Sequence, residues 1–169
     1  SFDWPNLYIN TQQKRKTKYS DIASIVRKFK NEFIIIYART RDETEKISKY
    51  LRIKSAPYHA GFNKKYRNKI QKDFMDGKIK CIVATIAFGM GINNKHVRCV
   101  IHYGCPNNLD SYYQEIGRAG RDGEKSECYM LYGDRDFWLS NMFISKIEDK
   151  KFMEYSFSIK RNSILSNSL

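Results

Sequence analysis

Short, nearly unbroken apolar runs separated by amphipathic stretches are the feature that most constrains the fold of this chain. The runs are residues 33–38 (FIIIYA), 80–85 (KCIVAT), 97–103 (VRCVIHY) and 128–132 (CYMLY). Apolar runs of this length are typical of strands that are buried on both faces of a parallel sheet. Strands alternating with helical segments predict an α/β fold with a mostly parallel central sheet and helices on both faces.

Helical spacing of apolar residues marks three segments, residues 19–30, 40–51 and 63–76. Shorter strands are expected at residues 7–9 and 56–59, and a basic turn at residues 11–18. Thr40 is the expected cap of one helix and Gly77 the stop of another. We expect one domain over residues 1–133. Residues 134–169 are expected to form a short helical extension, which is a candidate for the start of a truncated following subdomain.

The chain is strongly basic, with a net charge of +13 from 31 Lys+Arg against 18 Asp+Glu. This balance indicates a polyanionic partner, most simply nucleic acid, although positive charge that only aids solubility is the alternative. Absence of a long basic amphipathic helix disfavours a membrane surface. The four cysteines include no C-x-x-C pair, so neither a disulfide framework nor a zinc site is indicated. An intracellular, reducing compartment is expected, with no metal ligands in this chain.

Gln114 to Arg121 reads Q-x-x-G-R-x-x-R, with two arginines three residues apart. If this segment is helical, Gln114, Arg118 and Arg121 share one face. A guanidinium presents a planar fork of donors that suits phosphate oxygens, and such a group can neutralise charge on a transferred phosphoryl group. A basic surface helix with scattered ion pairs is the alternative interpretation.

Polar residues and glycines follow several of the predicted strands. Because ligands bind beyond the carboxyl ends of strands in open α/β sheets, these segments and the arginine motif are expected to converge on one edge. A helix N-terminus, hydroxyl groups, arginines and backbone amides at that edge would hold nucleic-acid phosphates. Structural roles, such as an ordinary helix cap or a structural histidine, are the alternatives. The candidate phosphate-binding residues are Arg39, Thr40, Arg41, His59, Ala60, Gly61 and Thr85.

Gly91 and Asn93 lie in a glycine-containing segment after residues 80–85. Gly91 permits close backbone approach, and Asn93 would reach a ribose or a γ-phosphate, although a tight turn explains the glycine equally well. The sequence contains no G-x-x-x-x-G-K-[ST] loop and no acidic pair closing an apolar strand. The chain therefore has arginines suited to a nucleoside triphosphate but lacks a loop to hold its β- and γ-phosphates, as expected for one half of an ATP site.

Four segments taken together resemble the second RecA-like domain of superfamily 2 helicases, and specifically the RecQ family. They are FIIIYARTRDE, YHAG, ATIAFGMGINNKHV and SYYQEIGRAGRDG, and the resemblance covers about residues 1–132. It implies an ATP-driven 3′-to-5′ DNA helicase that closes on ATP between two RecA-like domains and acts in the nucleus or nucleoid. It also implies that ATP and Mg²⁺ are bound mainly by a first RecA-like domain, which this sequence does not include. DNA and that first domain are the implied partners.

The resemblance also implies roles for individual residues. Arg121 matches the arginine finger, and Arg118 a residue that contacts the γ-phosphate or couples it to motion. Gln114 matches a sensor of the interdomain interface, and Asn93 a position near the nucleotide. Arg39, Thr40, Ala60, Gly61 and Thr85 match positions that hold the single-strand backbone. Two alternatives remain from the sequence. One is the second domain of an RNA helicase from another superfamily 2 branch, and the other is a non-catalytic nucleic-acid-binding module.

Overall fold

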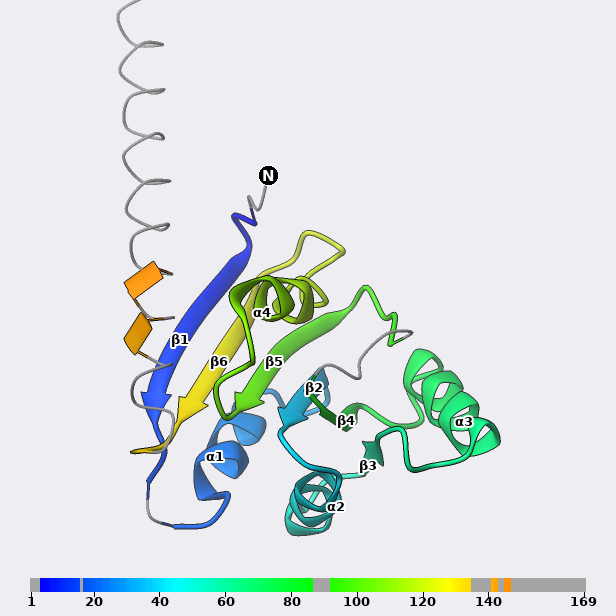
Figure 1. Cartoon of the computed structure of the whole chain (residues 1–169). Helices are drawn as coiled ribbons and strands as arrows, with labels where there is room; N and C mark the ends of the chain where they lie inside the picture. Colours follow the sequence, from blue (N-terminus) through cyan, green and yellow to red (C-terminus); the bar gives the residue numbers. More distant parts are fainter. Residues whose placement is uncertain (1–3, 16, 87–91, 135–140, 143–144, 147–169) are drawn as a thin grey trace, which may run out of the picture. The chain divides into compact units, whose positions relative to one another are not determined.

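The computed structural model describes residues 4–15, 17–86, 92–134, 141–142 and 145–146 (Figure 1). Residues 1–133 form one compact unit and residues 134–169 a second. The strands are β1 (Leu7–Gln13), β2 (Phe33–Ala38), β3 (Ser55–Tyr58), β4 (Cys81–Thr85), β5 (Val97–Tyr103) and β6 (Ser126–Tyr132). The helices are α1 (Ser20–Lys28), α2 (Arg41–Tyr50), α3 (Lys64–Met75) and α4 (Leu109–Ile116). The expected extension over residues 134–169 lies largely outside the described residues, so its helical character stays a prediction.

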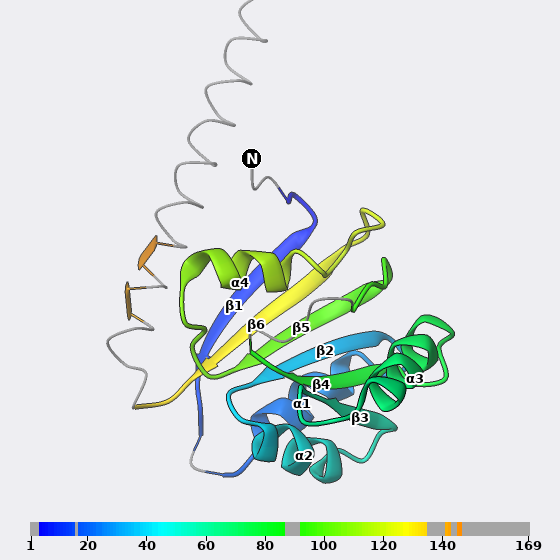
Figure 2. The same ribbon diagram turned by 45° about the vertical axis from the view of Figure 1, so that its right-hand side comes forward.

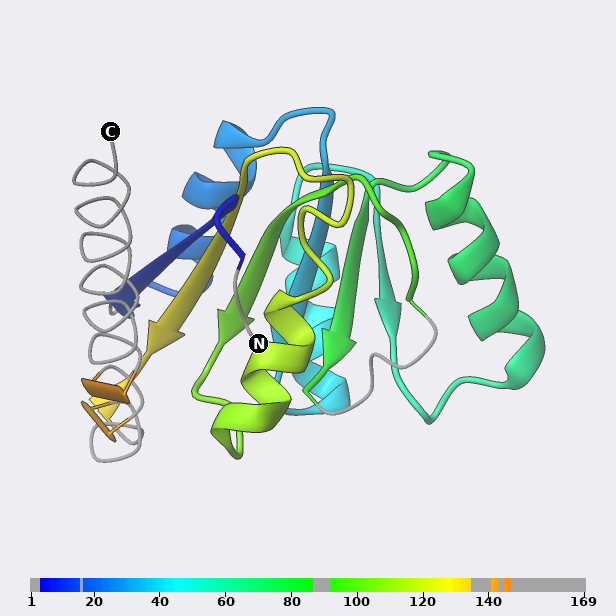
Figure 3. The same cartoon turned by 90° about the horizontal axis from the view of Figure 1, so that it is seen from above.

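The strands form a single sheet in the order β1-β6-β5-β2-β4-β3, and every strand pair in it is parallel. The connections through α1 and α2 cross the sheet in one direction, and those through α3 and α4 cross it in the other. Right-handed crossovers therefore place α1 and α2 on one face and α3 and α4 on the opposite face. Figures 2 and 3 show α4 across the sheet from α1 and α2, which confirms the predicted fold class.

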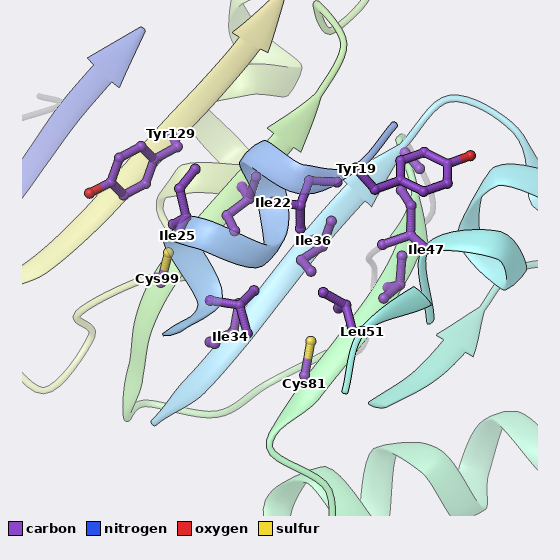
Figure 4. Close-up of a cluster of buried hydrophobic side chains, with 14 of the residues drawn as sticks. Tyr19, Ile22, Ile25, Ile34, Ile36, Ile47, Leu51, Cys81, Cys99 and Tyr129 are labelled. Carbon is purple, nitrogen blue, oxygen red and sulfur yellow. The ribbon is translucent and has the colours of Figure 1, made fainter. Parts of the chain in front are cut away.

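A cluster of buried side chains lies between the sheet and helices α1 and α2 (Figure 4). Alternate residues of the strands point into it, including Ile34 and Ile36 of β2, and Ile22, Ile25 and Ile47 pack on them from the helices. The four cysteines are buried and form no disulfide within the described residues. Burial raises the pKa of the Cys81 thiol, which keeps the thiol protonated and packing as a small apolar group. Among the described residues, every helix falls short of the length and apolar character that a bilayer crossing requires.

Side-chain caps mark where α2, α3 and α4 begin. Thr40 Oγ1 accepts the backbone N–H of Glu43, which confirms the predicted cap of α2. Asn63 and Asn108 accept in the same way at α3 and α4. Gly77 follows α3 with φ of 76°, a left-handed conformation that glycine adopts without steric cost.

Two expectations about individual elements are wrong. β1 continues to Gln13 instead of stopping at Ile9, because all seven of its residues pair with β6, and most of their side chains are exposed. Phe74 and Met75 were both expected to point inward from this helix; Phe74 is buried, as expected, whereas Met75 is 56% exposed. The last turn of α3 therefore directs Phe74, and not Met75, to the sheet.

Candidate functional site

Three of the predicted phosphate-binding segments meet at one edge of the sheet. Because β4 lies between β2 and β3, Thr85 pairs with Ala38, immediately before Arg39. On the other side of β4, Tyr58 pairs with Ala84, which brings the His59–Gly61 segment beside Thr85. We call this set of strand ends, with Arg39, Thr40, Arg41, His59, Ala60, Gly61 and Thr85, the carboxyl edge.

Arg39, Thr40 and Arg41 are exposed at the start of α2. Glu43 reaches back and accepts the Arg39 backbone N–H at 3.3 Å, so it supports the turn that presents these residues. The Arg39 guanidinium donates to the Cys105 carbonyl at 3.3 Å, beyond the end of β5. The Arg41 guanidinium lies over Gly61, 3.3 Å from where a Cβ would stand. Arg39 thus bridges the ends of β2 and β5, Arg41 reaches the loop after β3, and the helix cap Thr40 lies between them in the sequence.

His59 holds the loop at the end of β3 instead of facing solvent. Its imidazole is buried and its Nδ1 accepts the Gly61 N–H at 3.0 Å. The ring stacks on Phe62 with centroids 4.0 Å apart. A side chain at Gly61 would approach His59 Cε1 to 2.9 Å, so this turn requires glycine. In this conformation the Gly61 N–H is already engaged, and the exposed Ala60 lies at the tip of the loop.

The arginine motif lies at the opposite end of the strands, which corrects the expected convergence on one edge. α4 runs back against the direction of β5, so the turn after it reaches the amino ends of the strands. There Gly120 donates its N–H to the Val97 carbonyl and Asp122 donates to Lys95. The helix ends at Ile116, so Arg118 and Arg121 lie in the following turn and not on the helical face of Gln114.

The two arginines of this turn have different surroundings. Arg121 is exposed; its Nη1 donates to Asn93 Oδ1 at 3.0 Å and its Nε to the Gly117 carbonyl at 3.2 Å. Arg118 is half-buried and donates to the Ile92 carbonyl at 3.0 Å. Gln114 is exposed on α4. Among the residues that the structure describes, neither arginine forms an ion pair within 4.0 Å. Gly91 lies outside the described residues.

The turn after α4 that carries Arg118 and Arg121 is called here the arginine turn. Buried polar side chains pack beside it. His102 of β5 and Glu115 of α4 are 0% and 5% exposed, and their Nε2 and Oε2 atoms are 2.5 Å apart. The His102 ring stacks on Tyr37 with centroids 5.0 Å apart. Burial raises the pKa of the Tyr37 hydroxyl far above its usual range, and the Arg118 charge acts in the opposite direction. Tyr37 therefore stays protonated beside Arg118.

Comparison with known proteins identifies the protein family of this chain. The family model described as "Helicase conserved C-terminal domain" matches residues 17–123, a range that contains all twelve predicted site residues. The chain belongs to this helicase C-terminal domain family. Within the described residues of this helicase domain, no group of three or more His, Cys, Asp or Glu side chains is arranged to hold a metal ion.

Relatives of this helicase domain confirm the RecQ resemblance. It is 42% identical to the bifunctional 3′-5′ exonuclease/ATP-dependent helicase WRN of Mus musculus over 91% of the chain, and 40% identical to the ATP-dependent DNA helicase RecQ of Haemophilus influenzae over 88%. A putative ATP-dependent RNA helicase of Acanthamoeba polyphaga mimivirus is 48% identical over 91%. The chain spans 12%, 24% and 29% of these relatives, respectively.

A solved structure shares the fold of this helicase domain. The DEAD box protein from Methanococcus jannaschii superposes with a TM-score of 0.72 at 23% identity, covering 85% of this chain and 40% of that one. At this identity the similarity shows the fold alone. It supports the parallel sheet and its helices, and the roles of individual residues stay predictions.

Sequence reasoning missed the buried pair beneath the helicase domain's arginine turn. His102 is a polar residue inside an otherwise apolar strand, and a buried polar side chain requires a partner. That signal was present in the run VRCVIHY, whereas the partner, Glu115, is hidden inside the arginine motif. His96 and Arg98 were missed too, because their contacts to Asp122 join residues that lie 26 and 24 positions apart, respectively.

Gly120→Ala is expected to destabilise the domain far more than Gly123→Ala. Both glycines have positive φ, 60° and 86°, so each alanine incurs about 1–2 kcal/mol of left-handed strain. A Cβ at Gly120 would also stand 2.9 Å from the Glu124 carbonyl oxygen, whereas nothing lies within 4 Å at Gly123. Urea unfolding measures the difference. Equal losses in the two variants would contradict close packing of this turn.

Asp122→Asn is expected to lower the free energy of unfolding at pH 7, with a loss that disappears in acid. Burial alone would raise the pKa of Asp122, but hydrogen bonds from Arg98, His96 and the Glu124 N–H hold it well below its usual range. A depressed pKa stabilises the fold above the unfolded value of about 4, and this contribution is lost as the pH falls further. Urea unfolding from pH 7 to pH 2.5 measures it. Asp76→Asn, at an exposed helix end, is the control, and a pH-independent loss in Asp122→Asn would contradict the assignment.

Proposed function

We propose that this chain is the second RecA-like half of an ATP-dependent 3′-to-5′ DNA helicase of RecQ type. The observation that carries the proposal is the exposed Arg121 guanidinium beside Asn93, in a domain whose relatives include ATP-dependent DNA helicases. Two of the five N–H donors of Arg121 have protein partners. The side chain is exposed, so its remaining donors are proposed to contact a nucleotide held by a partner domain that docks at this surface.

The donor set at this surface fits the triphosphate of ATP, and each residue has a proposed role. Arg121 acts as the arginine finger, and Arg118 contacts the γ-phosphate or couples it to motion. Asn93 orients Arg121 and lies near the nucleotide, while the exposed Gln114 senses the interface. Gly91 is proposed to allow close backbone approach. Because the sequence contains no phosphate-binding loop, the first RecA-like domain is proposed to hold ATP with its Mg²⁺.

The carboxyl edge is proposed to hold the single-stranded DNA backbone. Its exposed arginines, the Thr85 hydroxyl and the N-terminus of α2 are donors that bind phosphates without reading sequence. Since the arginine turn lies at the other end of the strands, nucleotide and DNA would contact separate parts of the domain. The sheet and α4 connect these parts, so closure on ATP would move the DNA grip as one body. We propose that this activity takes place in the nucleus or nucleoid.

Arg41→Ala is expected to weaken binding of a 20-nucleotide single strand and to lower its salt dependence. Loss of one phosphate contact reduces the slope of log K against log salt by about 0.7 for a single strand. Fluorescence anisotropy across a range of salt concentrations measures both quantities. Lys72→Ala, which removes a charge from the last turn of α3, is the control and should leave the slope unchanged. An unaltered slope in Arg41→Ala would remove that residue from the grip.

Unwinding by the full-length protein tests the proposed activity. Matched DNA and RNA duplexes with 3′ overhangs are compared at equal ATP, and preferential unwinding of DNA is expected. Preferential unwinding of RNA would instead favour an RNA helicase, a second candidate motivated by the printed name of the mimivirus relative. ATP-independent binding without unwinding of either duplex would indicate a non-catalytic binding module and overturn the proposal.

A further inference from the structure

A groove lies at the amino ends of β2, β3 and β4, away from the carboxyl edge. It consists of two hollows of about 480 and 360 Å³, which adjoin at Val26 and Ile53. The first hollow lies between α1 and the end of α2. The second continues past the turns that precede β2 and β4. Neither the proposed ATP site nor the proposed DNA grip uses this surface.

The floor of the groove is apolar. Its lining includes Ala23, Val26, Phe29, Ile34, Leu51 and Ile53. Ile53 is 40% exposed and the neighbouring Tyr50 45% exposed, although each is a large hydrophobic residue. Tyr50 presents its ring edgewise to Tyr19, with centroids 5.7 Å apart, so its position is fixed by packing. The floor therefore offers aliphatic and aromatic surface that a ligand can cover.

The rim of the groove is cationic. It is formed by Arg27, Lys30, Arg52, Lys54, Lys78 and Lys80, against one acidic lining residue, Glu32. Within the described part of the chain, none of these six side chains forms an ion pair within 4.0 Å. Lys80 and Arg27 donate to neutral groups, the Asn31 carbonyl and the Ser24 hydroxyl. Asp73 interacts electrostatically with Lys78 and Lys54, and Glu32 lines the groove, but the six cations still outnumber these two carboxylates.

We propose that this groove binds an acidic peptide segment with apolar anchors, contributed by a partner protein. Charge complementarity selects acidic residues for the rim, and the floor selects aliphatic or aromatic side chains between them. The phosphates of a nucleic acid would pair with the cationic rim, but a nucleic acid has no aliphatic groups to cover the apolar floor. The groove lies at the amino ends of the strands and the carboxyl edge at their other ends. The domain therefore binds the peptide and single-stranded DNA at the same time.

Binding of defined peptides tests the proposal. The probes are two fluorescein-labelled 14-residue peptides that combine Asp and Glu with Leu and Phe, one at helical spacing and one at alternate positions. A peptide with the same anchors and lysines in place of the acids is the control. Fluorescence anisotropy compares the wild-type protein with Arg52→Glu/Lys54→Glu, with Ile53→Ser, and with the charge-matched Lys64→Glu/Lys65→Glu at the exposed start of α3. Circular dichroism verifies that each variant is folded.

At least one acidic peptide is expected to bind the wild-type protein. Its affinity should fall at least tenfold in Arg52→Glu/Lys54→Glu and in Ile53→Ser. In the control Lys64→Glu/Lys65→Glu it should fall less than twofold. Competition with a 20-nucleotide single strand should leave peptide binding unchanged. The proposal is overturned if neither peptide binds, if the lysine peptide binds equally well, or if both groove variants bind normally. It is also overturned if the oligonucleotide displaces the peptide and loses affinity in the Arg52→Glu/Lys54→Glu variant, because the groove would then be a nucleic-acid surface.

Discussion

Arg121→Ala and Arg121→Lys are both expected to lower ATP turnover by the full-length protein about 10³–10⁵-fold, the range over which arginine fingers act. ATP binding should change far less, because the phosphate-binding loop is proposed to belong to the first domain. The lysine variant keeps the positive charge but lacks the planar guanidinium. A guanidinium can donate to Asn93 and to a phosphate at the same time, whereas an ammonium offers no such fork of donors. Single-turnover hydrolysis and equilibrium ATP binding separate the two effects.

Lys95→Ala is the matched control for this prediction, because it removes an exposed positive charge from the same end of the domain. It should retain near-normal turnover. Arg121 packs against neutral partners at the surface, so neither Arg121 variant should lower the free energy of unfolding by more than about 1 kcal/mol. Near-normal turnover in Arg121→Lys would show that a point charge suffices and would remove the arginine-finger role.

The buried strands could be predicted from the sequence because burial on both faces leaves an unmistakable apolar run. Residues 33–38 and 97–103 were predicted with the bounds that β2 and β5 have in the structure. β1 was predicted too short because the polar half of an edge strand has no such run. Its pairing with β6 depends on a partner more than a hundred residues away, which local pattern cannot reveal.

The carboxyl edge could be predicted because ligands bind beyond the carboxyl ends of strands in open α/β sheets. The strand order of the structure then places Thr85 between the ends of β2 and β3. The arginine turn was misplaced because that rule describes where a strand ends and not where the following helix finishes. α4 carries the chain back across the sheet before Arg118 and Arg121 are reached. Predicting its direction requires the length of this helix, and no apolar run or helical spacing over residues 109–116 was used to predict one.

The buried pair His102–Glu115 explains how α4 is fixed once it has crossed the sheet. Glu115 lies one helical turn before Arg118, and the Arg118 N–H bonds the Glu115 carbonyl at 3.3 Å. His102 anchors this turn to β5, where it also stacks on Tyr37 and meets the Tyr112 ring at 5.0 Å. We therefore expect the pair to position the arginine turn, while contacts to ATP belong to the arginines themselves.

Glu115→Leu is expected to lower the free energy of unfolding by about 3 kcal/mol, because it leaves the buried His102 imidazole without a partner at either ring nitrogen. His102→Phe should also lower the free energy of unfolding, because it removes the imidazole that contacts the buried Glu115 carboxylate. The double variant should be more stable than either single variant, since replacing both partners of a buried pair by apolar groups is often nearly neutral. Urea unfolding of the four proteins forms a double-mutant cycle. If the double variant loses the sum of the two single losses, the pair is not coupled. Low ATP turnover in a stable double variant would show that the pair sets the position of the arginine turn as well as its stability.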